Sequence, residues 1–271
     1  FVLPNQMIMK MMFLSMIVAY LCGNVYIFVR TLQALSCLSL GWKVVFSLGY
    51  WIAALALVLS IFVLRHVEMP EVLSQGLFTL GSVWLVFTLY MVLALAATDT
   101  TSIFLPAIKP YGFYLSLGAV ACLLAYGYFN YKHPDINRID ITLDKPLPGK
   151  PMKIVAISDV HLGNGTRKPQ LKKFVEMINA QNPDLIIISG DLIDNSLLPL
   201  YQQKMAEELS QLKAPMGIYM APGNHEYISG IEACESFLKD TPIQLLRDSI
   251  VTLPNGLQII GRDDRANRHR M

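Results

Sequence analysis

Four long stretches without a charged side chain dominate the first half of the chain, at residues 11–29, 44–64, 72–98 and 110–131. A helix needs about 20 consecutive apolar residues to cross the hydrocarbon core of a bilayer. Each stretch is close to or above that length, so we predict an α-helical membrane domain of four transmembrane helices over residues 1–131. A cleaved signal peptide has a shorter apolar core and a cleavage site. Buried helices of a large soluble core are the alternative.

The charged residues are divided unequally between the two halves of the chain. The sequence has 22 Lys and Arg against 20 Asp and Glu, but residues 1–131 hold only eight of these side chains. The net charge of +2 therefore describes neither half. It also gives no sign of the basic surface that nucleic-acid-binding proteins carry.

The positive residues that flank the predicted spans favour one orientation. Four spans place both chain ends on the same side, where six Lys or Arg residues lie, against three on the other side. The larger group is Lys10, Arg65, Lys132, Arg138, Lys145 and Lys150, and the smaller is Arg30, Lys43 and Lys109. The positive-inside rule then predicts that the C-terminal domain is cytoplasmic.

A transporter or channel is one alternative function for a chain with so many apolar segments. Transport pathways usually place ionisable residues inside the spans. Here all eight charges of the first half lie outside the four uncharged stretches, which disfavours transport.

The second half has the pattern of a soluble α/β domain. Residues 132–150 are predicted to be a linker, which contains Pro134, Pro146, Pro148 and a short strand-like segment at 139–143. Buried-strand patterns follow at 153–157, 185–189 and 218–221, and helical patterns separate them. Such alternation favours βαβ units and a largely parallel sheet. A third helix is expected at about 230–239, and three short strands at about 243–246, 250–253 and 257–261.

Asp159 and His161 directly follow the first predicted strand. Residues two apart in an extended segment point to the same side, so this carboxylate and this imidazole can bind one metal ion. The alternative is that Asp159 caps the next helix and His161 is solvated.

Gly190 and Asp191 directly follow the second predicted strand. Glycine permits backbone conformations that other residues avoid, so the next carboxylate can approach a metal closely. The two oxygens of Asp191 can bridge two ions. Asp194 is expected to orient a catalytic imidazole by a hydrogen bond, and the alternative is a helix cap near Ser196.

The tetrapeptide Gly223-Asn224-His225-Glu226 follows the third predicted strand. The amide oxygen of Asn224 suits a hard or borderline ion that carboxylates already surround. His225 could protonate a leaving oxygen or hold a phosphoryl oxygen. Because open α/β sheets place ligand groups at the carboxyl ends of the strands, the three loops are expected to meet at one edge of the sheet.

Together these motifs resemble the calcineurin-like metallophosphoesterase family in its membrane-anchored branch, over roughly residues 151–271. The family pattern is Asp-x-His, Gly-Asp, Gly-Asn-His-Asp/Glu and two later His motifs. The resemblance implies a β-sandwich flanked by helices, two divalent metal ions (Mn, Fe, Zn or similar), and hydrolysis of phosphate esters or anhydrides.

The resemblance also implies a role for each matching residue. Asp159 and His161 would bind the first metal, Asp191 would bridge the two metals, and Asn224 would bind the second. His225, paired with Asp194, would contact the phosphate and assist the leaving group.

The two later His motifs of the family have no counterpart among the five histidines of this sequence. His66 and His133 flank predicted spans, and His269 lacks the expected strand and glycine context. We therefore expect residues 151–271 to be the N-terminal half of a C-terminally truncated domain, and the chain by itself to be inactive or very weak. A catalytically inactive, membrane-anchored binding protein is the alternative.

Residues 261–264 (Gly-Arg-Asp-Asp) resemble a segment of the branch that includes certain UDP-2,3-diacylglucosamine pyrophosphohydrolases. With the membrane domain, this resemblance suggests a lipid-linked phosphate substrate such as a UDP-diacylglucosamine. Arg262 and Arg265 could pair bidentately with a pyrophosphate, or they could be solvated charges. The apolar residues 197–201 could meet acyl chains, or they could pack under the next helix.

Overall fold

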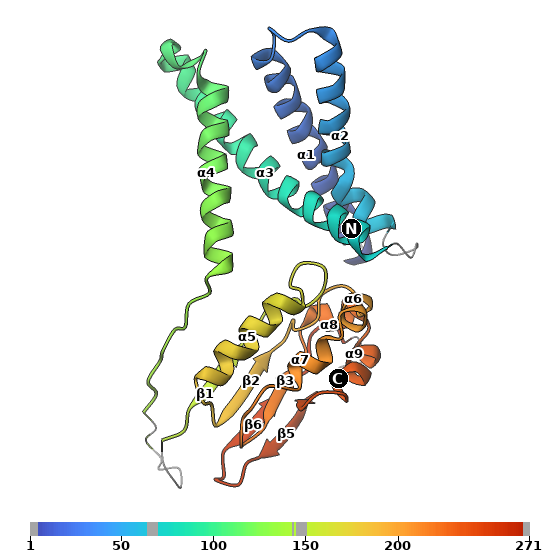
Figure 1. Cartoon of the computed structure of the whole chain (residues 1–271), viewed down its shortest axis with the longest axis vertical. Helices are drawn as coiled ribbons and strands as arrows, with labels where there is room; N and C mark the ends of the chain where they lie inside the picture. Colours follow the sequence, from blue (N-terminus) through green and yellow to red (C-terminus); the bar gives the residue numbers. More distant parts are fainter. Residues whose placement is uncertain (1–4, 64–69, 143, 145–150, 268–271) are drawn as a thin grey trace. The chain divides into compact units, whose positions relative to one another are not determined.

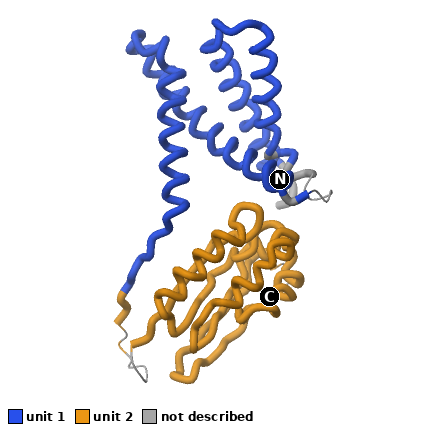
Figure 2. The backbone as a smooth tube through the Cα atoms, viewed as in Figure 1, with its two compact units in different colours: residues 1–139 blue, residues 140–271 orange. Residues whose placement is uncertain are grey.

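The computed structural model describes residues 5–63, 70–142, 144 and 151–267 (Figure 1). The chain divides into two compact units, residues 1–139 and residues 140–271 (Figure 2). Each unit is described by itself below.

Unit 1 is helical. Its elements are α1 (Asn5–Ala34), α2 (Leu40–Val63), α3 (Glu71–Phe104), a short 3₁₀ helix η1 (Pro106–Ile108) and α4 (Gly112–Lys132). Among the described residues, three segments are long and apolar enough to cross a membrane: Met11–Ala34, Val72–Phe104 and Gly112–Lys132. The apolar part of α2 is shorter, at Leu40–Ala56. Three membrane-length helices are thus present, and the fourth span stays a prediction.

Polar side chains inside unit 1 are paired between helices. Asn24 is fully buried, and its side-chain oxygen accepts hydrogen bonds from Trp84 Nε1 at 2.9 Å and from Tyr50 Oη at 3.2 Å. Arg30 on α1 forms an ion pair with Asp99 on α3, with 2.8 Å between Nη2 and Oδ1. Since unpaired polar groups are costly in an apolar environment, these contacts stabilise the packing of the helices. The helices extend beyond the uncharged stretches and include five of the eight charged residues of positions 1–131, namely Lys10, Arg30, Lys43, Glu71 and Asp99.

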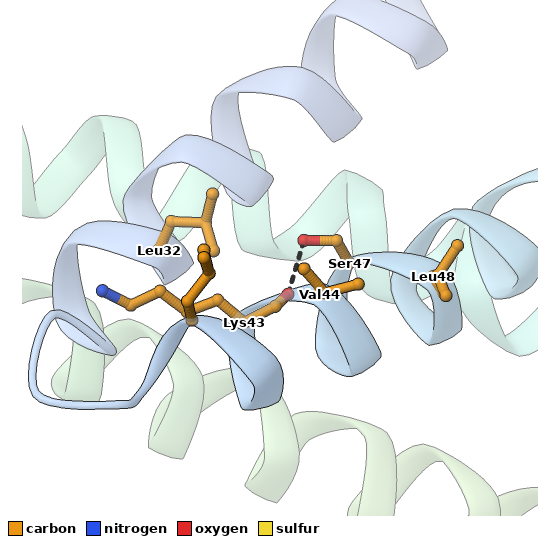
Figure 3. Close-up of a pocket in the computed structure, with 6 residues that line it drawn as sticks. Leu32, Lys43, Val44, Ser47 and Leu48 are labelled. Atoms are coloured by element: carbon orange, nitrogen blue, oxygen red, sulfur yellow. Dashed lines mark hydrogen bonds between the residues drawn. The ribbon is translucent and has the colours of Figure 1, made fainter.

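A groove between α1 and α2 is lined by Leu32, Leu40, Lys43, Val44, Ser47 and Leu48 (Figure 3). The Lys43 ammonium at its edge donates a hydrogen bond to the backbone oxygen of Ser36 at 3.1 Å. Ser47 turns its hydroxyl back to the Lys43 carbonyl at 2.7 Å. The lining is almost entirely aliphatic, and none of the residues predicted to carry chemistry lies in it.

Unit 2 is built on a four-stranded sheet of order β1-β2-β3-β4. The strands are β1 (Ile154–Ile157), β2 (Leu185–Ser189), β3 (Ile218–Ala221) and β4 (Ile243–Leu245), and all of them pair in parallel. Two further strands, β5 (Ser249–Thr252) and β6 (Gln258–Gly261), form an antiparallel hairpin. The predicted parallel sheet is confirmed, whereas the β-sandwich stays a prediction.

Five helices accompany the sheet of unit 2 in the part of the chain that the structure describes. They are α5 (Lys168–Ala180), α6 (Leu198–Gln202), α7 (Met205–Leu209), α8 (Asn224–Ser229) and α9 (Ile231–Leu238). The short helices α6 and α8 had no clear helical period in the sequence. Cys234 on α9 is fully buried in the main core.

Alternate residues of the central strands serve two hydrophobic cores. Ile186 and Ile188 of β2 pack into the core that the helices share, whereas Leu185 packs with Leu246 and Leu253 on the hairpin side. This alternation follows from the period of two in a strand. The first strand differs from the predicted buried run: among the described strands β1 pairs only with β2, and its Ile154 is 43% exposed.

The strand-like segment predicted at 139–143 is wrong for residues 139–142, which have no regular secondary structure. Ile139 and Ile141 are 81% and 78% exposed. An isolated strand has little stability without a partner, and none of the described strands pairs with this segment. Leu143, Pro146 and Pro148 of the predicted linker lie outside the described residues.

Candidate metal centre

Three loops leave the carboxyl ends of β1, β2 and β3 and carry the residues that the sequence motifs singled out. Residues 158–163 follow β1, residues 190–194 follow β2, and residues 222–225 follow β3. Parallel pairing brings these strand ends to one edge of the sheet. The strand order β1-β2-β3 thus makes the loops neighbours in space, as expected.

Backbone hydrogen bonds tie the first loop to the second. The amide of His161 donates to the Asp191 carbonyl at 2.9 Å, and the amide of Leu162 donates to the Leu192 carbonyl at 2.8 Å. In return, the Asp194 amide donates to the Leu162 carbonyl at 3.0 Å. The positions of these predicted site residues are therefore set by main-chain contacts.

Three predicted ligands adopt left-handed backbone conformations, which are unusual for residues other than glycine. The φ angles are +53° for Asp159, +49° for His161 and +52° for Asp191. Such conformations cost free energy, and they concentrate at functional sites because the surrounding structure must hold them in place.

Glycine is required where the second and third loops touch. Gly190 has a φ of +78°, and a Cβ atom there would lie 2.8 Å from the Cα of Gly223. A Cβ atom on Gly223 would lie 2.3 Å from Oδ1 of Asp191. Both distances are shorter than a carbon atom tolerates, so the two glycines allow the loops to approach each other around Asp191.

The Glu226 side chain holds the second and third loops together. Its side chain is fully buried, and Oε2 accepts hydrogen bonds from the amides of Asp191 at 3.0 Å and Gly223 at 2.8 Å. Oε1 accepts a third from the amide of Ile193 at 2.9 Å. One carboxylate thus joins the second loop to the start of α8. The sequence motif does not by itself assign this role to Glu226, although its place three residues after the helix cap Gly223 is typical of a capping-box acid.

The loops bring two imidazoles and one carboxylate together. One ligand atom each from His161, Asp191 and His225 lies within 4.8 Å of the others, and the three residues are partly exposed. The rings of His161 and His225 meet edge to face, with centroids 4.4 Å apart. This donor set suits a borderline divalent metal ion. His225, predicted as a catalytic residue, is therefore also placed where it could be a ligand.

Asp194 lies next to both imidazoles. Its Oδ1 is 3.0 Å from Nδ1 of His225 and 3.5 Å from Nδ1 of His161. The His225 contact has ion-pair distance but not hydrogen-bond alignment, and among the described residues this buried Nδ1 has no hydrogen-bond partner. Burying a ring nitrogen without a partner costs free energy. The Nδ1 atom of His225 is therefore available to a further polar group or ion. Asp194 has the proximity to His225 that the sequence predicts, without the bond.

Asp159 and Asn224 lie at the margin of this group. The Asp159 carboxylate is 67% exposed, and its Oδ1 is 3.8 Å from Nε2 of His161. Asn224 is the exposed first residue of α8, next to His225. The backbone amide of His225 donates to Oδ1 of Asp191 at 2.9 Å, which keeps the start of α8 close to the predicted bridging residue.

The predicted substrate residues divide into exposed and buried groups. Arg262 and Arg265 are exposed, whereas Asp263 between them is buried. In the apolar run, Leu197, Pro199 and Leu200 are buried, but Leu198 and Tyr201 are 50% and 53% exposed. The packing alternative thus holds for three of the five residues of that run, and the side chains of Leu198 and Tyr201 remain available to a ligand.

Comparison with known proteins agrees with this geometry. The calcineurin-like phosphoesterase family matches residues 152–267. A protein named as an uncharacterized metallophosphoesterase from Helicobacter pylori (strain ATCC 700392 / 26695) is 34% identical over 161 residues, which are 58% of this chain and 42% of that protein. A transmembrane protein with metallophosphoesterase domain from Danio rerio is 34% identical over 138 residues, 50% of this chain and 31% of that protein.

A third relative, the uncharacterized metallophosphoesterase YkuE of Bacillus subtilis (strain 168), is 34% identical over 117 residues, 42% of this chain and 41% of that protein. The chain therefore spans less than half of the length of these three relatives. No solved structure matches the chain.

Proposed function

Because residues 152–267 carry a domain of the calcineurin-like phosphoesterase family, we propose that the protein hydrolyses phosphate ester or anhydride bonds at a divalent metal centre. The observation that carries this proposal is the meeting of His161, Asp191 and His225 within 4.8 Å at the carboxyl edge of a parallel sheet. We infer that the apolar helices of unit 1 anchor this domain in a membrane, since three of them are long and apolar enough to cross one.

The proposed metal residues are Asp159, His161, Asp191 and Asn224, and we propose that they hold two divalent ions; the grouping of His161 and Asp191 with His225 supports a metal centre at this place. Ions at such a site polarise phosphoryl oxygens and activate water. Support for a bridging Asp191 comes from its backbone, which Glu226 and Gly190 hold close to both neighbouring loops. His225 could serve either as a further ligand or as the group that meets the phosphate.

The proposed task of His225 is to hold a phosphoryl oxygen or to give a proton to the leaving oxygen. Asp194 supports this role, since its Oδ1 is 3.0 Å from Nδ1 of the ring. A carboxylate beside the imidazole can orient the ring once the two groups align. General acid catalysis of this kind typically contributes 10²–10⁴-fold to a rate, as an order of magnitude.

The first experiment removes metal from the purified full-length protein with a chelator and then restores Mn²⁺, Zn²⁺ or Mg²⁺ one at a time. Hydrolysis of a generic aryl phosphodiester is expected to disappear and to return with at least one ion. Metal content is measured in the same samples. Hydrolysis that continues unchanged in the metal-free protein would contradict the proposal.

His225→Gln separates the two roles proposed for this residue. If His225 meets the phosphate, the variant keeps its metal content and loses most hydrolysis. If His225 is a ligand, metal content falls as well. Asp140→Asn serves as a matched control, because Asp140 is exposed and lies in the irregular segment before the sheet.

For the substrate, we propose a lipid-linked phosphate such as a UDP-diacylglucosamine, cleaved on the cytoplasmic side of the membrane. The support is the membrane domain together with exposed Leu198 and Tyr201. Leu198 follows Asp194 by four residues, so their Cα atoms are at most about 14 Å apart. An acyl chain at α6 would therefore be close to a phosphate at the metal centre.

A further inference from the structure

A buried carboxylate outside the predicted site gathers four hydrogen-bond donors. Asp263 is 5% exposed. Its Oδ1 accepts from Tyr227 Oη at 2.5 Å and from the Asp264 amide at 2.9 Å. Its Oδ2 accepts from Arg247 Nε at 3.1 Å and from Asn267 Nδ2 at 2.9 Å. A buried charge is tolerated only when it is well paired. The four donors meet this requirement for Asp263, so the fold specifically accommodates its charge.

The cluster joins elements that are far apart in the sequence. Tyr227 belongs to α8, Arg247 lies between β4 and β5, and Asp263 follows β6. Arg247 also donates from Nη2 to the Tyr227 hydroxyl at 3.1 Å, and its guanidinium lies 5.9 Å from the centre of the Tyr227 ring. The phenol is thus held by a carboxylate and a guanidinium that also bind each other.

Helix α8 is the element that begins with Asn224 and His225, and it has only six residues. A helix of this length is not stable by itself, because the free-energy cost of nucleation exceeds the stabilisation from the few hydrogen bonds it can form. Side-chain contacts instead attach it to the rest of the unit, among them those of Glu226 and Tyr227. Glu226 binds the loop after β2, and Tyr227 binds Asp263.

The ionised form of Asp263 is favoured in this setting. Burial alone would raise the pKa of its carboxyl, but hydrogen bonds from Tyr227, Asn267 and Arg247 outweigh burial and lower the pKa below its ordinary value. The carboxylate therefore stays charged and remains an acceptor for all of its donors at neutral pH.

We propose that Asp263 is a positioning residue for the metal centre: it acts through the Tyr227 hydroxyl to hold α8, and with it Asn224 and His225, at the edge of the sheet. This inference rests on the proposed function of that site. Within the segment 261–265, it is the buried Asp263 that contacts α8, whereas Arg262 and Arg265 are exposed.

The test compares Tyr227→Phe, Asp263→Asn and the double variant in the full chain. Tyr227→Phe removes one oxygen and keeps the ring, so the fold is expected to survive. Tyr219→Phe is the matched control, since Tyr219 is a buried tyrosine of β3 in the other core. Two quantities are measured: the affinity for Mn²⁺, from the signal of the free ion in electron paramagnetic resonance, and the hydrogen exchange of residues 224–229 in metal-free protein.

Both single variants are expected to bind Mn²⁺ about tenfold more weakly, the lower end of the effect of residues that orient metal ligands. Exchange of α8 is expected to accelerate, and the double variant to be no worse than either single variant, because all remove the same link. The inference would be overturned if Tyr227→Phe kept the wild-type Mn²⁺ affinity and the wild-type hydrogen exchange of α8. An equal loss of Mn²⁺ affinity in Tyr219→Phe would also overturn it.

The two proposals can fail separately. If the variants show these shifts but the wild-type protein hydrolyses no phosphodiester, the positioning role stands and the proposed function fails. If the protein binds no Mn²⁺, exchange of α8 alone decides the positioning role. Hydrolysis with unchanged α8 exchange would leave the function standing and remove the role of Asp263.

Discussion

At the scale of single residues, Asp191 is the side chain on which most of the proposed site depends. It contributes to the ligand group, accepts a hydrogen bond from the His225 amide, and has a left-handed backbone held by Glu226. We expect Asp191→Asn to remove most hydrolysis and to lower the content of both metals, because one bridging oxygen becomes an amide nitrogen that repels cations. Metal analysis and phosphodiester turnover of the same sample check this, and near wild-type values in both would contradict the bridge.

Glu226 gives a prediction about stability. In Glu226→Gln, one oxygen that accepts a backbone N–H becomes an NH₂ group that faces it, and at least one buried donor loses its partner. The expected loss is about 1–3 kcal/mol in the free energy of unfolding, the usual cost of such a group. Chemical unfolding of the protein measures it. Glu232→Gln on the exposed side of α9 is the control and is expected to change little.

The sequence was informative about which residues meet, and less so about how they are held. His161, Asp191, Asp194 and His225 were all predicted from motif spacing, and the structure brings them together. Their roles stay predictions, because ligation depends on distances that spacing does not give. The contacts of Glu226 and Asp263 were missed, since a buried acid looks the same in a sequence as a solvated one.

At the scale of elements, the strands were more predictable than the short helices. Continuous apolar runs identify β2 and β3 because both faces of these strands are covered. Helices α6 and α8 have five and six residues, which are too few for a repeat of apolar residues with the helical period to be recognised. For residues 139–142 a strand was predicted that the structure does not contain. The alternating apolar pattern is present there, but no described strand pairs with it.

The network that holds α8 has a consequence for pH. Because the pKa of Asp263 is lowered in the folded protein, its contribution to stability is present above the unfolded value of about 3.9 and is lost as pH falls through the folded value. We therefore expect the metal-free wild type to lose more Tm than Asp263→Asn between about pH 5 and pH 3. Equal pH dependence of the two proteins, measured by thermal unfolding in chelator, would contradict this expectation.

At the scale of the whole molecule, the orientation of the membrane domain is a prediction from positive charge. Arg65, Lys145 and Lys150, three of the six residues that favour a cytoplasmic catalytic domain, lie outside the described residues. The loop between α1 and α2 contains Cys37, which the same rule places on the opposite side. The two sides can therefore be distinguished by chemical labelling.

A membrane-impermeant maleimide applied to intact cells is expected to label Cys37 and not a cysteine introduced at exposed Ser236 on α9. The Ser236→Cys site is expected to react only after the cells are permeabilised. Cys37→Ser in the same background identifies the signal of the native loop, and buried Cys234 is not expected to react in the folded protein. Labelling of Ser236→Cys in intact cells would reverse the predicted orientation.

The substrate proposal also belongs to the whole molecule, because it joins the anchor to the site. A lipid-linked pyrophosphate presented in micelles is expected to give a higher kcat/KM than a soluble cyclic nucleotide. Leu198→Ser should reduce kcat/KM for the lipid substrate by roughly threefold to tenfold, the size expected when one exposed leucine loses its contact with an acyl chain. Hydrolysis of a small aryl phosphodiester should not change, because that substrate does not reach α6.

Ile250→Ser provides the matched control, since Ile250 is also an exposed aliphatic residue of unit 2 but lies on the hairpin strand β5. An equal loss in both variants would indicate a general effect of surface polarity on micelle binding. A clear preference for the soluble nucleotide would remove the lipid substrate. The metal centre would remain, because the two imidazoles and the carboxylate meet at the sheet edge whatever ester they act on.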